Sequence, residues 1–400
     1  LVGEELYEKS LALPDYNDSI RLQDAGERLI ALSDIYNIYI PSDMSAEIYC
    51  KLYIALVRSL QKKNTTDTIR QLNENHKMIQ KEAHNGIIGG SDCFTITGCS
   101  GIGKSSAIYR AIDLIGINGV IETKTPYRKI IPFVVVQTPF DCSAKGLLLD
   151  ILRQVDEQVG SDYYSKGIRT RVTTDMLIGM VSQVALNHIG LLVVDEIQNI
   201  VKNKGGMNLV NMLTQLINSS GISICMVGTP ESISFFEQAL QLARRSLGLH
   251  YNPLEFNDYF CDFCKTIFEY QYTKEKVELT DSILHWLYEH SGGIISAVIS
   301  LMHDTQEIAI LNGVEKICPE TLNLAYQNRL SMLHTYIEPK ITKRAQTNTN
   351  KKTADTYMET DKITSDNRVT ISSLIKKSKS ECVDAIDLLK QYFSVTEVQI

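Results

Sequence analysis

The segment GCSGIGKS at residues 98–105 constrains the fold of this chain more than any other feature. It fits the pattern Gly-x4-Gly-Lys-Ser, follows an apolar run at residues 93–96 and precedes a helical pattern at residues 106–114. In such a strand–loop–helix unit, the glycines allow backbone N–H groups to surround phosphates at the start of the helix. The sequence therefore predicts a site that binds the phosphates of a nucleotide.

The residues of this loop have distinct expected roles. The lysine of the pattern reaches the β- and γ-phosphates, and the serine that follows it holds Mg²⁺. The loop residues that we expect to bind the nucleotide and its metal are Gly98, Gly101, Gly103, Lys104 and Ser105.

A second nucleotide motif, LLVVDE, occupies residues 191–196. Its four apolar residues predict a buried strand that places Asp195 and Glu196 at its carboxyl end, where parallel sheets bind their ligands. Asp195 is expected to hold the magnesium shell together with Ser105, and Glu196 to polarise the attacking water. An adjacent acidic pair favours hydrolysis over phosphoryl transfer to a small molecule.

The composition narrows the class of protein. With 400 residues and 44% hydrophobic content, the chain can form two or three domains. The sequence shows no signal-peptide pattern and no apolar run near 20 residues, so we expect a cytoplasmic protein. Nine cysteines without a disulfide pattern fit a reducing compartment. We interpret Cys261 and Cys264, the one C-x-x-C, as positions on an amphipathic helix rather than a zinc site.

The net charge of −7 argues against a surface that is basic throughout, so any contact with DNA must be local. Two stretches qualify. One contains Lys166, Arg169 and Arg171, and the other, residues 340–352, contains five basic residues and no acidic one. Either stretch alone could also be ordinary solvated surface.

Strand and helix patterns alternate through the middle of the chain. Expected strands at residues 94–97, 133–137, 191–195 and 222–227, separated by helices, predict an α/β fold with a parallel sheet flanked by helices. Thr229, at the end of the last of these strands, could contact the γ-phosphate or the water, or could be a turn residue before Pro230. A helix is expected at residues 45–60, with Ser45 as its cap.

The predicted domain organisation has four parts. Residues 1–85 form an N-terminal arm and helices that pack on the core and bind partners, 86–255 the nucleotide-binding subdomain, 256–339 a small helical lid, and 340–400 a flexible linker with an amphipathic tail. The apolar pattern at residues 369–393 of that tail is typical of a partner-binding peptide.

Two arginines, Arg244 and Arg245, end the helical pattern at residues 231–242. They could neutralise the dipole at the helix end. In ring-forming ATPases, an arginine at such a place instead projects into the phosphates of the neighbouring subunit. The sequence does not distinguish which of the two would do so.

Four segments together, GCSGIGKS, LLVVDEIQ, VGTPES and LARR, resemble the AAA+ ATPases. More closely, the segments DCSAKG, LLVVDEIQNI and GTPESISFFEQALQLARRSLG are similar to those of the TnsC family of transposition regulators. The resemblance covers roughly residues 45–338 and is most specific at residues 195–198 and 242–245.

The resemblance implies an AAA+ P-loop ATPase that uses ATP and Mg²⁺ and hydrolyses ATP slowly, as a regulator. Such proteins assemble with ATP into a ring or filament on target duplex DNA, largely independently of sequence. They link a target-selection protein of the TnsD or TniQ type to the transposase subunits TnsA and TnsB, in the bacterial cytoplasm near the nucleoid.

Further site residues follow from the resemblance alone. Ser106 joins the nucleotide-binding residues, Thr229 becomes the polar sensor, and Arg244 or Arg245 reaches the neighbouring subunit. The DNA-binding residues would be Lys145, Lys166, Arg169 and Arg171.

The chain departs from the family pattern in the lid. Many AAA+ proteins carry Gly-x-x-Arg there, but residues 291–296 read SGGIIS, without arginine. We therefore expect weak basal hydrolysis that DNA or a partner stimulates. The alternatives are a replication-initiator or clamp-loader-like ATPase, disfavoured as an initiator because no winged-helix pattern follows the lid, and a signalling NTPase that acts only on protein partners. A P-loop kinase fits least, since it has no ready role for Glu196.

Overall fold

The computed structural model describes residues 1–63, 70, 93–116, 119–124, 127–169, 172–199, 206–220, 222–233 and 248–330. The chain divides into two units, Leu1–Ile337 and Glu338–Ile400, and every described residue belongs to the first. The basic stretch at residues 340–352 and the predicted partner-binding tail lie outside the described residues.

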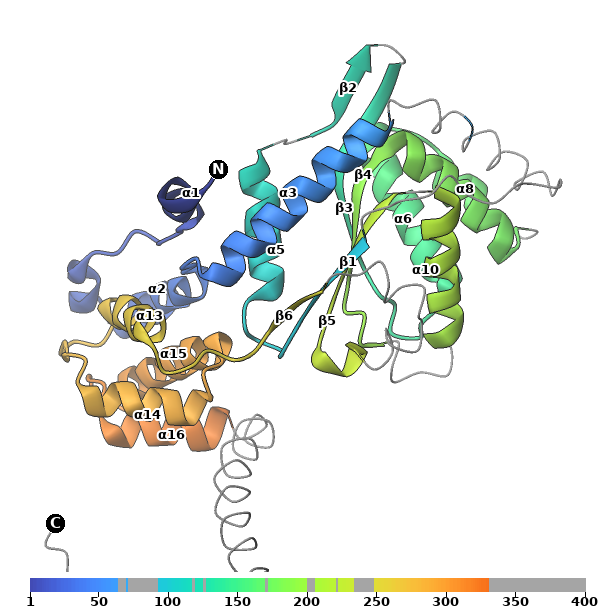
Figure 1. Ribbon diagram of the computed structural model, residues 1–400. Helices are drawn as coiled ribbons and strands as arrows, with labels where there is room; N and C mark the ends of the chain where they lie inside the picture. The colour runs from blue at the N-terminus through green and yellow to red at the C-terminus, as the bar shows by residue number, and fades with distance from the viewer. Residues whose placement is uncertain are drawn as a thin grey trace, which may run out of the picture. The chain divides into compact units, whose positions relative to one another are not determined.

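A six-stranded sheet forms the centre of the core (Figure 1), with the strand order β2-β3-β4-β5-β1-β6. The strands are β1 (Cys93–Gly98), β2 (Ile121–Lys124), β3 (Tyr127–Gln137), β4 (Ile189–Asp195), β5 (Ser223–Gly228) and β6 (Leu249–Tyr251). All neighbours pair in parallel except β2, which is antiparallel to β3. The predicted α/β fold is confirmed, with the β2 hairpin as an edge that the sequence patterns did not reveal.

Helices cover both faces of the sheet. Helices α3 (Asp43–Lys63) and α5 (Lys104–Ile115) pack on one face, and α6 (Ala144–Val159), α8 (Thr174–His188) and α10 (Gly206–Ser220) on the other. Side chains of β5 alternate between these layers, since Ile224 and Met226 join the cluster under α6 whereas Cys225 and Val227 join the cluster under α5. Strands buried on both faces explain the continuous apolar runs of the sequence.

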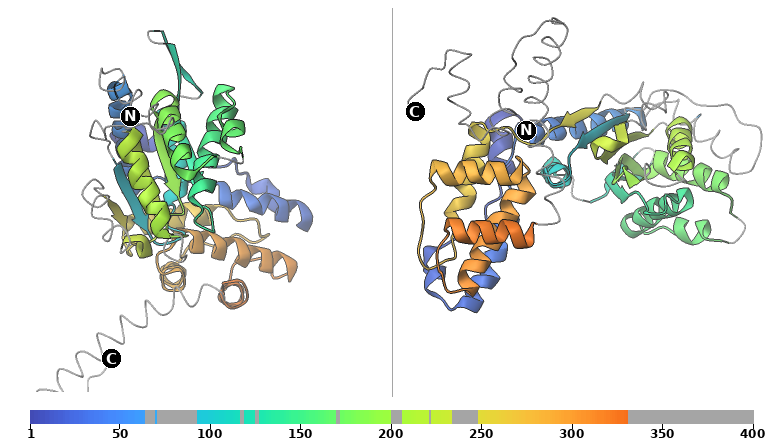
Figure 2. Two further views of the ribbon diagram at one scale, coloured as in Figure 1. Left: turned by 90° about the vertical axis from the view of Figure 1, so that its right-hand side faces the viewer. Right: turned by 90° about the horizontal axis from the view of Figure 1, so that it is seen from below.

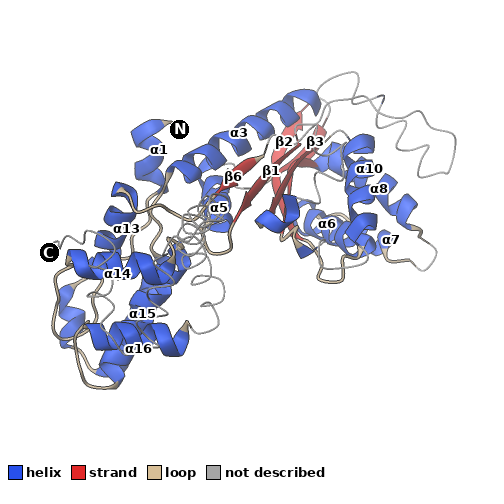
Figure 3. Ribbon diagram, turned by 60° about the horizontal axis from the view of Figure 1, so that its bottom comes forward, coloured by secondary structure: helices blue, strands red, loops and turns tan. Residues whose placement is uncertain are grey.

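The described residues of the lid form four helices: α13 (Asp258–Glu269), α14 (Asp281–Ser291), α15 (Ile295–Leu311) and α16 (Pro319–Arg329) (Figure 3). Asn257 caps α13 by accepting from the N–H of Phe260, and Thr280 caps α14 by accepting from that of Ile283. Cys264 is buried in the lid core on α13. Within the described residues, no single helix has the length and apolar composition of a membrane span, although α14 and α15, bent by 120°, would pass as a pair.

The N-terminal arm contacts both the core and the lid. It comprises α1 (Gly3–Ser10), two short 3₁₀ helices (Asp18–Leu22 and Ser33–Asn37) and α2 (Ala25–Leu32). Leu32 and Ile35 are fully buried in the lid cluster. Helix α2 and the second 3₁₀ helix contact α15, and the blue arm lies beside the orange lid in the right-hand view of Figure 2. From α5 of the core, Arg110 donates to the carbonyl oxygens of Ser10 (2.9 Å) and Leu11 (3.3 Å). The arm therefore joins two parts of the unit rather than packing on the core alone.

The start of α3 differs from the prediction that Ser45 is its cap. The helix begins at Asp43, and the carbonyl of Ser42 accepts the first helical hydrogen bond, from the N–H of Ala46 (3.1 Å). The N–H of Ser42 donates to Ser45 Oγ (3.1 Å), and the N–H of Ser45 donates to Ser42 Oγ (3.4 Å). Ser42 is thus the cap, and Ser45 is its reciprocal partner in the first turn.

An ion pair between a buried arginine and a partly buried glutamate holds the arm to the lid. Arg28, 1% exposed on α2, donates to both carboxylate oxygens of Glu315 over 2.7 and 2.8 Å and to the carbonyl oxygen of Tyr272 over 3.0 Å. The hydrogen bond from Arg28 holds the pKa of Glu315 below its usual value. Two-pronged pairing of this kind fixes the geometry of both partners.

We expect Arg28→Ala to lower the free energy of unfolding by about 2–3 kcal/mol, because it removes the buried hydrogen bonds of Arg28, while Lys274 stays 3.8 Å from Glu315. Urea unfolding followed by circular dichroism measures this change. Arg329→Ala is the matched control, since Arg329 pairs with Glu307 over 3.0 Å at the lid surface and is half exposed. Equal losses in the two variants would contradict the role given to Arg28.

Candidate nucleotide-binding site

The carboxyl ends of three neighbouring strands carry the candidate site. β5 lies between β1 and β4, while the chain itself passes from β1 to the far side of the sheet before returning. Open α/β sheets bind ligands where the strand order reverses in this way. The arrangement brings together the glycine loop after β1, Thr229 after β5 and Asp195 at the end of β4.

The glycine loop has the backbone that its sequence predicts. Gly101 and Gly103 have φ angles of 81° and 94°, in the left-handed region that favours glycine. A Cβ on Gly101 would lie 2.1 Å from Ser296 Oγ at the start of α15, so a side chain there would also collide with the lid. Helix α5 begins at Lys104 without a side-chain cap, which leaves its first N–H groups suited to an anion.

Lys104 is almost fully buried at the floor of the site. Its Nζ donates to the carbonyl oxygens of Gly98 (2.7 Å) and Cys99 (2.8 Å). Burial lowers the pKa of Lys104, and the nearby carboxylate of Asp195 offsets part of that effect. A bound polyphosphate would place negative charge beside this buried ammonium group and so compensate for its burial.

Ser105 and Asp195 form the candidate magnesium site. Ser105 Oγ donates to Asp195 Oδ2 over 3.0 Å, and Asp195 Oδ1 accepts from the N–H of Glu196 over 2.7 Å. Mg²⁺ prefers a few protein oxygens together with water and phosphate oxygens. A hydroxyl beside a carboxylate fits that preference, so the two residues could hold Mg²⁺ against the β- and γ-phosphates.

Glu196 and Thr229 line the same pocket, a cavity of about 250 Å³ that also contains Ser106. Glu196 is exposed and has a φ of 57°, which turns the chain sharply after β4. Its carboxylate accepts a hydrogen bond from Gln198 Nε2. Thr229 Oγ1 donates to Glu231, so in this state the predicted sensor hydroxyl points to a neighbouring acid.

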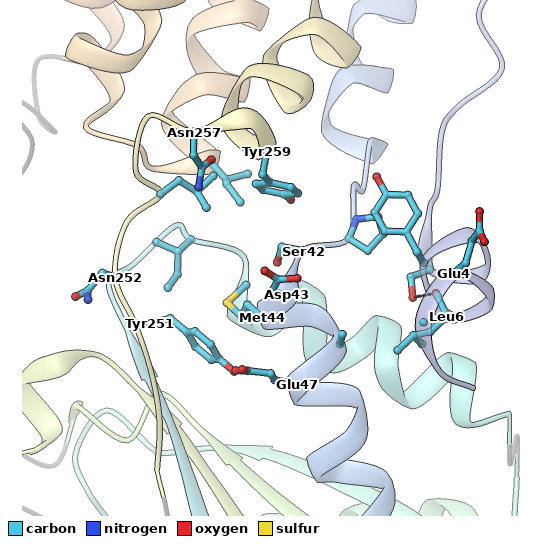
Figure 4. A pocket seen from close by; sticks show the side chains of 18 residues that line it. Glu4, Leu6, Ser42, Asp43, Met44, Glu47, Tyr251, Asn252, Asn257 and Tyr259 are labelled. Carbon is cyan, nitrogen blue, oxygen red and sulfur yellow. Dashed lines mark hydrogen bonds between the residues drawn. The ribbon is translucent and has the colours of Figure 1, made fainter.

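A larger cavity of about 670 Å³ adjoins the phosphate pocket, and Ile295 lines both (Figure 4). Its walls come from α1, the start of α3, the glycine loop, the chain after β6 and the lid. Tyr251 donates to Glu47 Oε2 over 2.8 Å inside it, and burial raises the pKa of this tyrosine. The size and position of the cavity suit the base and ribose of a nucleotide whose phosphates occupy the smaller pocket.

Sequence reasoning missed the residues of this second cavity. Labelled side chains in Figure 4 come from three distant parts of the chain: Glu4 and Leu6; Ser42, Asp43, Met44 and Glu47; and Tyr251, Asn252, Asn257 and Tyr259. No spacing pattern connects them, because only the packing of the arm between core and lid brings them together.

The lid reaches the glycine loop through its backbone. The N–H of Ser296 donates to the carbonyl oxygen of Gly101 over 3.0 Å. A Cβ on Gly293 would lie 2.0 Å from the carbonyl oxygen of Leu254, so this turn packs tightly against the chain leaving β6. Among the described residues, no arginine lines either cavity. The lid therefore contacts the loop through neutral backbone groups, in the region where many AAA+ proteins carry the lid arginine.

Three of the four predicted DNA-binding residues are described, and all three are exposed. Lys145 lies in the first turn of α6, whose cap Ser143 accepts from the N–H of Gly146. Lys166 lies on α7 (Tyr163–Gly167) and pairs with Asp162 over 2.6 Å. A Cβ on Gly167 would lie 3.0 Å from Leu149, one turn after Lys145, so α7 folds back along α6. This packing places Gly167, the residue after Lys166, against α6 one turn from Lys145.

The loop that leads to Lys145 is hydrogen-bonded to the turn after β4. The N–H of Thr138 donates to the carbonyl oxygen of Asp195 (2.9 Å), and Asn199 Nδ2 donates to that of Thr138 (3.2 Å). Cys142 Sγ donates to the carbonyl oxygen of Asn199 (3.1 Å). A displacement of the loop would therefore also shift the turn that carries Glu196.

Three predicted site residues, Arg171, Arg244 and Arg245, lie outside the described residues. Their roles stay predictions, as do those of the site residues that the structure places around the two cavities.

A family model described as an AAA domain matches residues 87–235. This match and the sheet described above give this part of the chain the AAA+ P-loop fold, a mostly parallel sheet flanked by helices. None of the curated protein sequences compared with the chain matches it.

Among solved structures, the Aeropyrum pernix ORC1 protein in complex with DNA is similar at 13% identity with a TM-score of 0.42; the match covers 65% of this chain and 63% of that one. The ADP form of the Aeropyrum pernix ORC2 protein is similar at 17% identity with a TM-score of 0.39, covering 66% and 68%. The chain thus spans less than two thirds of the length of the ORC1 structure.

We expect Lys104→Ala to weaken ATP binding by roughly 100-fold, or about 2.7 kcal/mol, because the buried ammonium group no longer faces the phosphates. Titration with a fluorescent ATP analogue measures the affinity. Lys265→Ala is the matched control, since Lys265 is exposed on α13 and pairs with Asp262 over 2.9 Å. Unchanged affinity in Lys104→Ala would contradict the assignment of the pocket.

Proposed function

We propose that the chain is an ATP-dependent, DNA-binding regulator of transposition. It binds ATP and Mg²⁺ between core and lid, assembles as a ring or filament on target duplex DNA, and is released by slow hydrolysis. In this role it links a target-selection protein of the TnsD or TniQ type to a transposase of the TnsA and TnsB type, in the bacterial cytoplasm. The similarity of its motifs to TnsC supports the transposition role, and the geometry of the site supports the nucleotide switch.

The hydrolytic step follows from the placement of the pocket residues. Water attacks the γ-phosphorus as the bond to the bridging oxygen breaks, so that ADP and inorganic phosphate form, and Glu196 accepts or directs the proton of the water. Lys104 stabilises the charge on the transferred group. Mg²⁺, held by Ser105 and Asp195, would neutralise charge on the β- and γ-phosphate oxygens. The neutral contact between lid and loop supports slow turnover.

The loop before Lys145 is hydrogen-bonded to the turn that carries Glu196, and this contact supports a link between DNA binding and hydrolysis. Exposed Lys145 and Arg169 offer positive charge to phosphates on a chain that is acidic overall. Contacts of this kind hold the duplex without reading its sequence. Through the hydrogen bonds of Thr138 and Asn199, a shift of this loop on DNA binding would move the turn that carries Glu196. This coupling supports stimulation of hydrolysis by DNA.

We expect the double variant Lys145→Glu with Arg169→Glu to bind duplex DNA roughly 10- to 100-fold more weakly in the presence of ATP. The slope of log affinity against log salt concentration should also become shallower by about 2, because two phosphate contacts are lost. Fluorescence anisotropy at several salt concentrations measures both quantities.

The control is Lys265→Glu with Lys316→Glu, which reverses two exposed charges on the lid. Equal DNA affinity in both double variants and the wild type would show that Lys145 and Arg169 do not bind DNA. If, in addition, the wild type showed no DNA binding at all, a switch directed at protein partners would be the better explanation.

A further inference from the structure

Gln198 joins two sides of the phosphate pocket. Its Nε2 donates to Glu196 Oε2, and its Oε1 accepts from the backbone N–H of Thr229 over 3.3 Å. One amide therefore bridges the residue expected to direct the water, after β4, and the residue expected to sense the γ-phosphate, after β5. Gln198 itself lines the phosphate pocket.

The chemistry of the two partners fixes the orientation of this amide. The N–H of Thr229 is a donor, so it requires the amide oxygen, and the carboxylate of Glu196 is an acceptor, so it requires the NH₂ group. A flipped amide would lose both hydrogen bonds. Because the backbone N–H cannot rotate, it holds the NH₂ group toward Glu196.

The backbone beneath Gln198 is held to β5 as well. Ile197 is fully buried, and its N–H donates to the carbonyl oxygen of Val227 over 3.0 Å. A Cβ on Gly228 would lie 2.5 Å from Ile197 Cγ2 and 3.1 Å from Gln198 Oε1, so the close approach of the turn to β5 requires glycine there. The amide of Gln198 thus extends from a rigid base.

Glu196 needs such a support because its side chain is exposed and its own backbone provides only a sharp turn. An unrestrained carboxylate would populate several rotamers, of which few direct a water at the γ-phosphorus. A charge-assisted hydrogen bond from a fixed amide selects among them.

We propose that Gln198 is a positioning residue for hydrolysis, which aims the Glu196 carboxylate and ties it to the backbone at Thr229. This inference rests on the proposed ATPase function and adds a residue to it. Any shift of the β5 end that a γ-phosphate produces at Thr229 then reaches Glu196 through one side chain.

The test is a double-mutant cycle with Gln198→Met and Glu196→Gln, measured as single-turnover hydrolysis of radiolabelled ATP by the full chain with Mg²⁺ and duplex DNA. Methionine keeps the volume of Gln198 and removes both hydrogen bonds. We expect Gln198→Met to slow hydrolysis by roughly 10- to 100-fold while ATP affinity stays within about threefold. In the Glu196→Gln background, the same change should alter the residual rate by less than about twofold, because the carboxylate that Gln198 positions is already absent.

Two further variants sharpen the result. Gln198→Glu keeps the acceptor for Thr229 but replaces the donor with a second carboxylate, so it should slow hydrolysis at least as much as Gln198→Met does. Gln158→Met, on the exposed end of α6, makes the same replacement away from the site and should leave the rate unchanged.

A loss of ATP affinity that matches the loss of rate would overturn the positioning role, as would an equal rate loss in the Glu196→Gln background or faster hydrolysis in Gln198→Met. These outcomes differ from failure of the proposed function itself. In that case the wild type and Glu196→Gln would hydrolyse ATP at the same negligible rate, and the role of Gln198 would fall with it.

Discussion

The parallel pairing of β1, β5 and β4 is the constraint on which the rest of the site depends. Because these strands are neighbours and run the same way, the glycine loop, the β5 end and the acidic turn meet at one edge of the sheet. The hydrogen bond from Ser105 to Asp195 spans the width of the strand between them. A slip of one residue in any of these strands would separate the hydroxyl from the carboxylate and move buried side chains to the opposite face.

The second half of the site depends on the arm. Residues of α1 and the start of α3 form one wall of the larger cavity, and residues after β6 and in the lid form the other. The arm is fixed to the lid by Arg28 and to the core by the hydrogen bonds of Arg110. A nucleotide that filled both cavities would contact all three parts, so its binding and release would bear on how they pack. This physical link is what a nucleotide switch requires.

Sequence reasoning found residues around the smaller pocket and none of those that distinguish the larger cavity. Glycine spacing and the apolar run before Asp195 report local backbone demands, so they can be recognised in a few residues, and the structure brings Lys104, Ser105 and Asp195 together as expected. Tyr251 and Glu47 meet only through tertiary packing, which no local pattern encodes. The edge strand β2 and the cap at Ser42 were missed for a similar reason, since short polar strands and alternative serines near a helix start give weak signals.

In the proposed function, the nucleotide state controls assembly on duplex DNA. The most direct measurement is the affinity for a duplex and the mass of the complexes, by anisotropy and mass photometry, with ATP, a non-hydrolysable analogue, ADP and no nucleotide. We expect large assemblies on DNA with ATP and the analogue, and affinity at least roughly 10-fold weaker with ADP. A chain that stayed monomeric and bound DNA equally in all four conditions would contradict it.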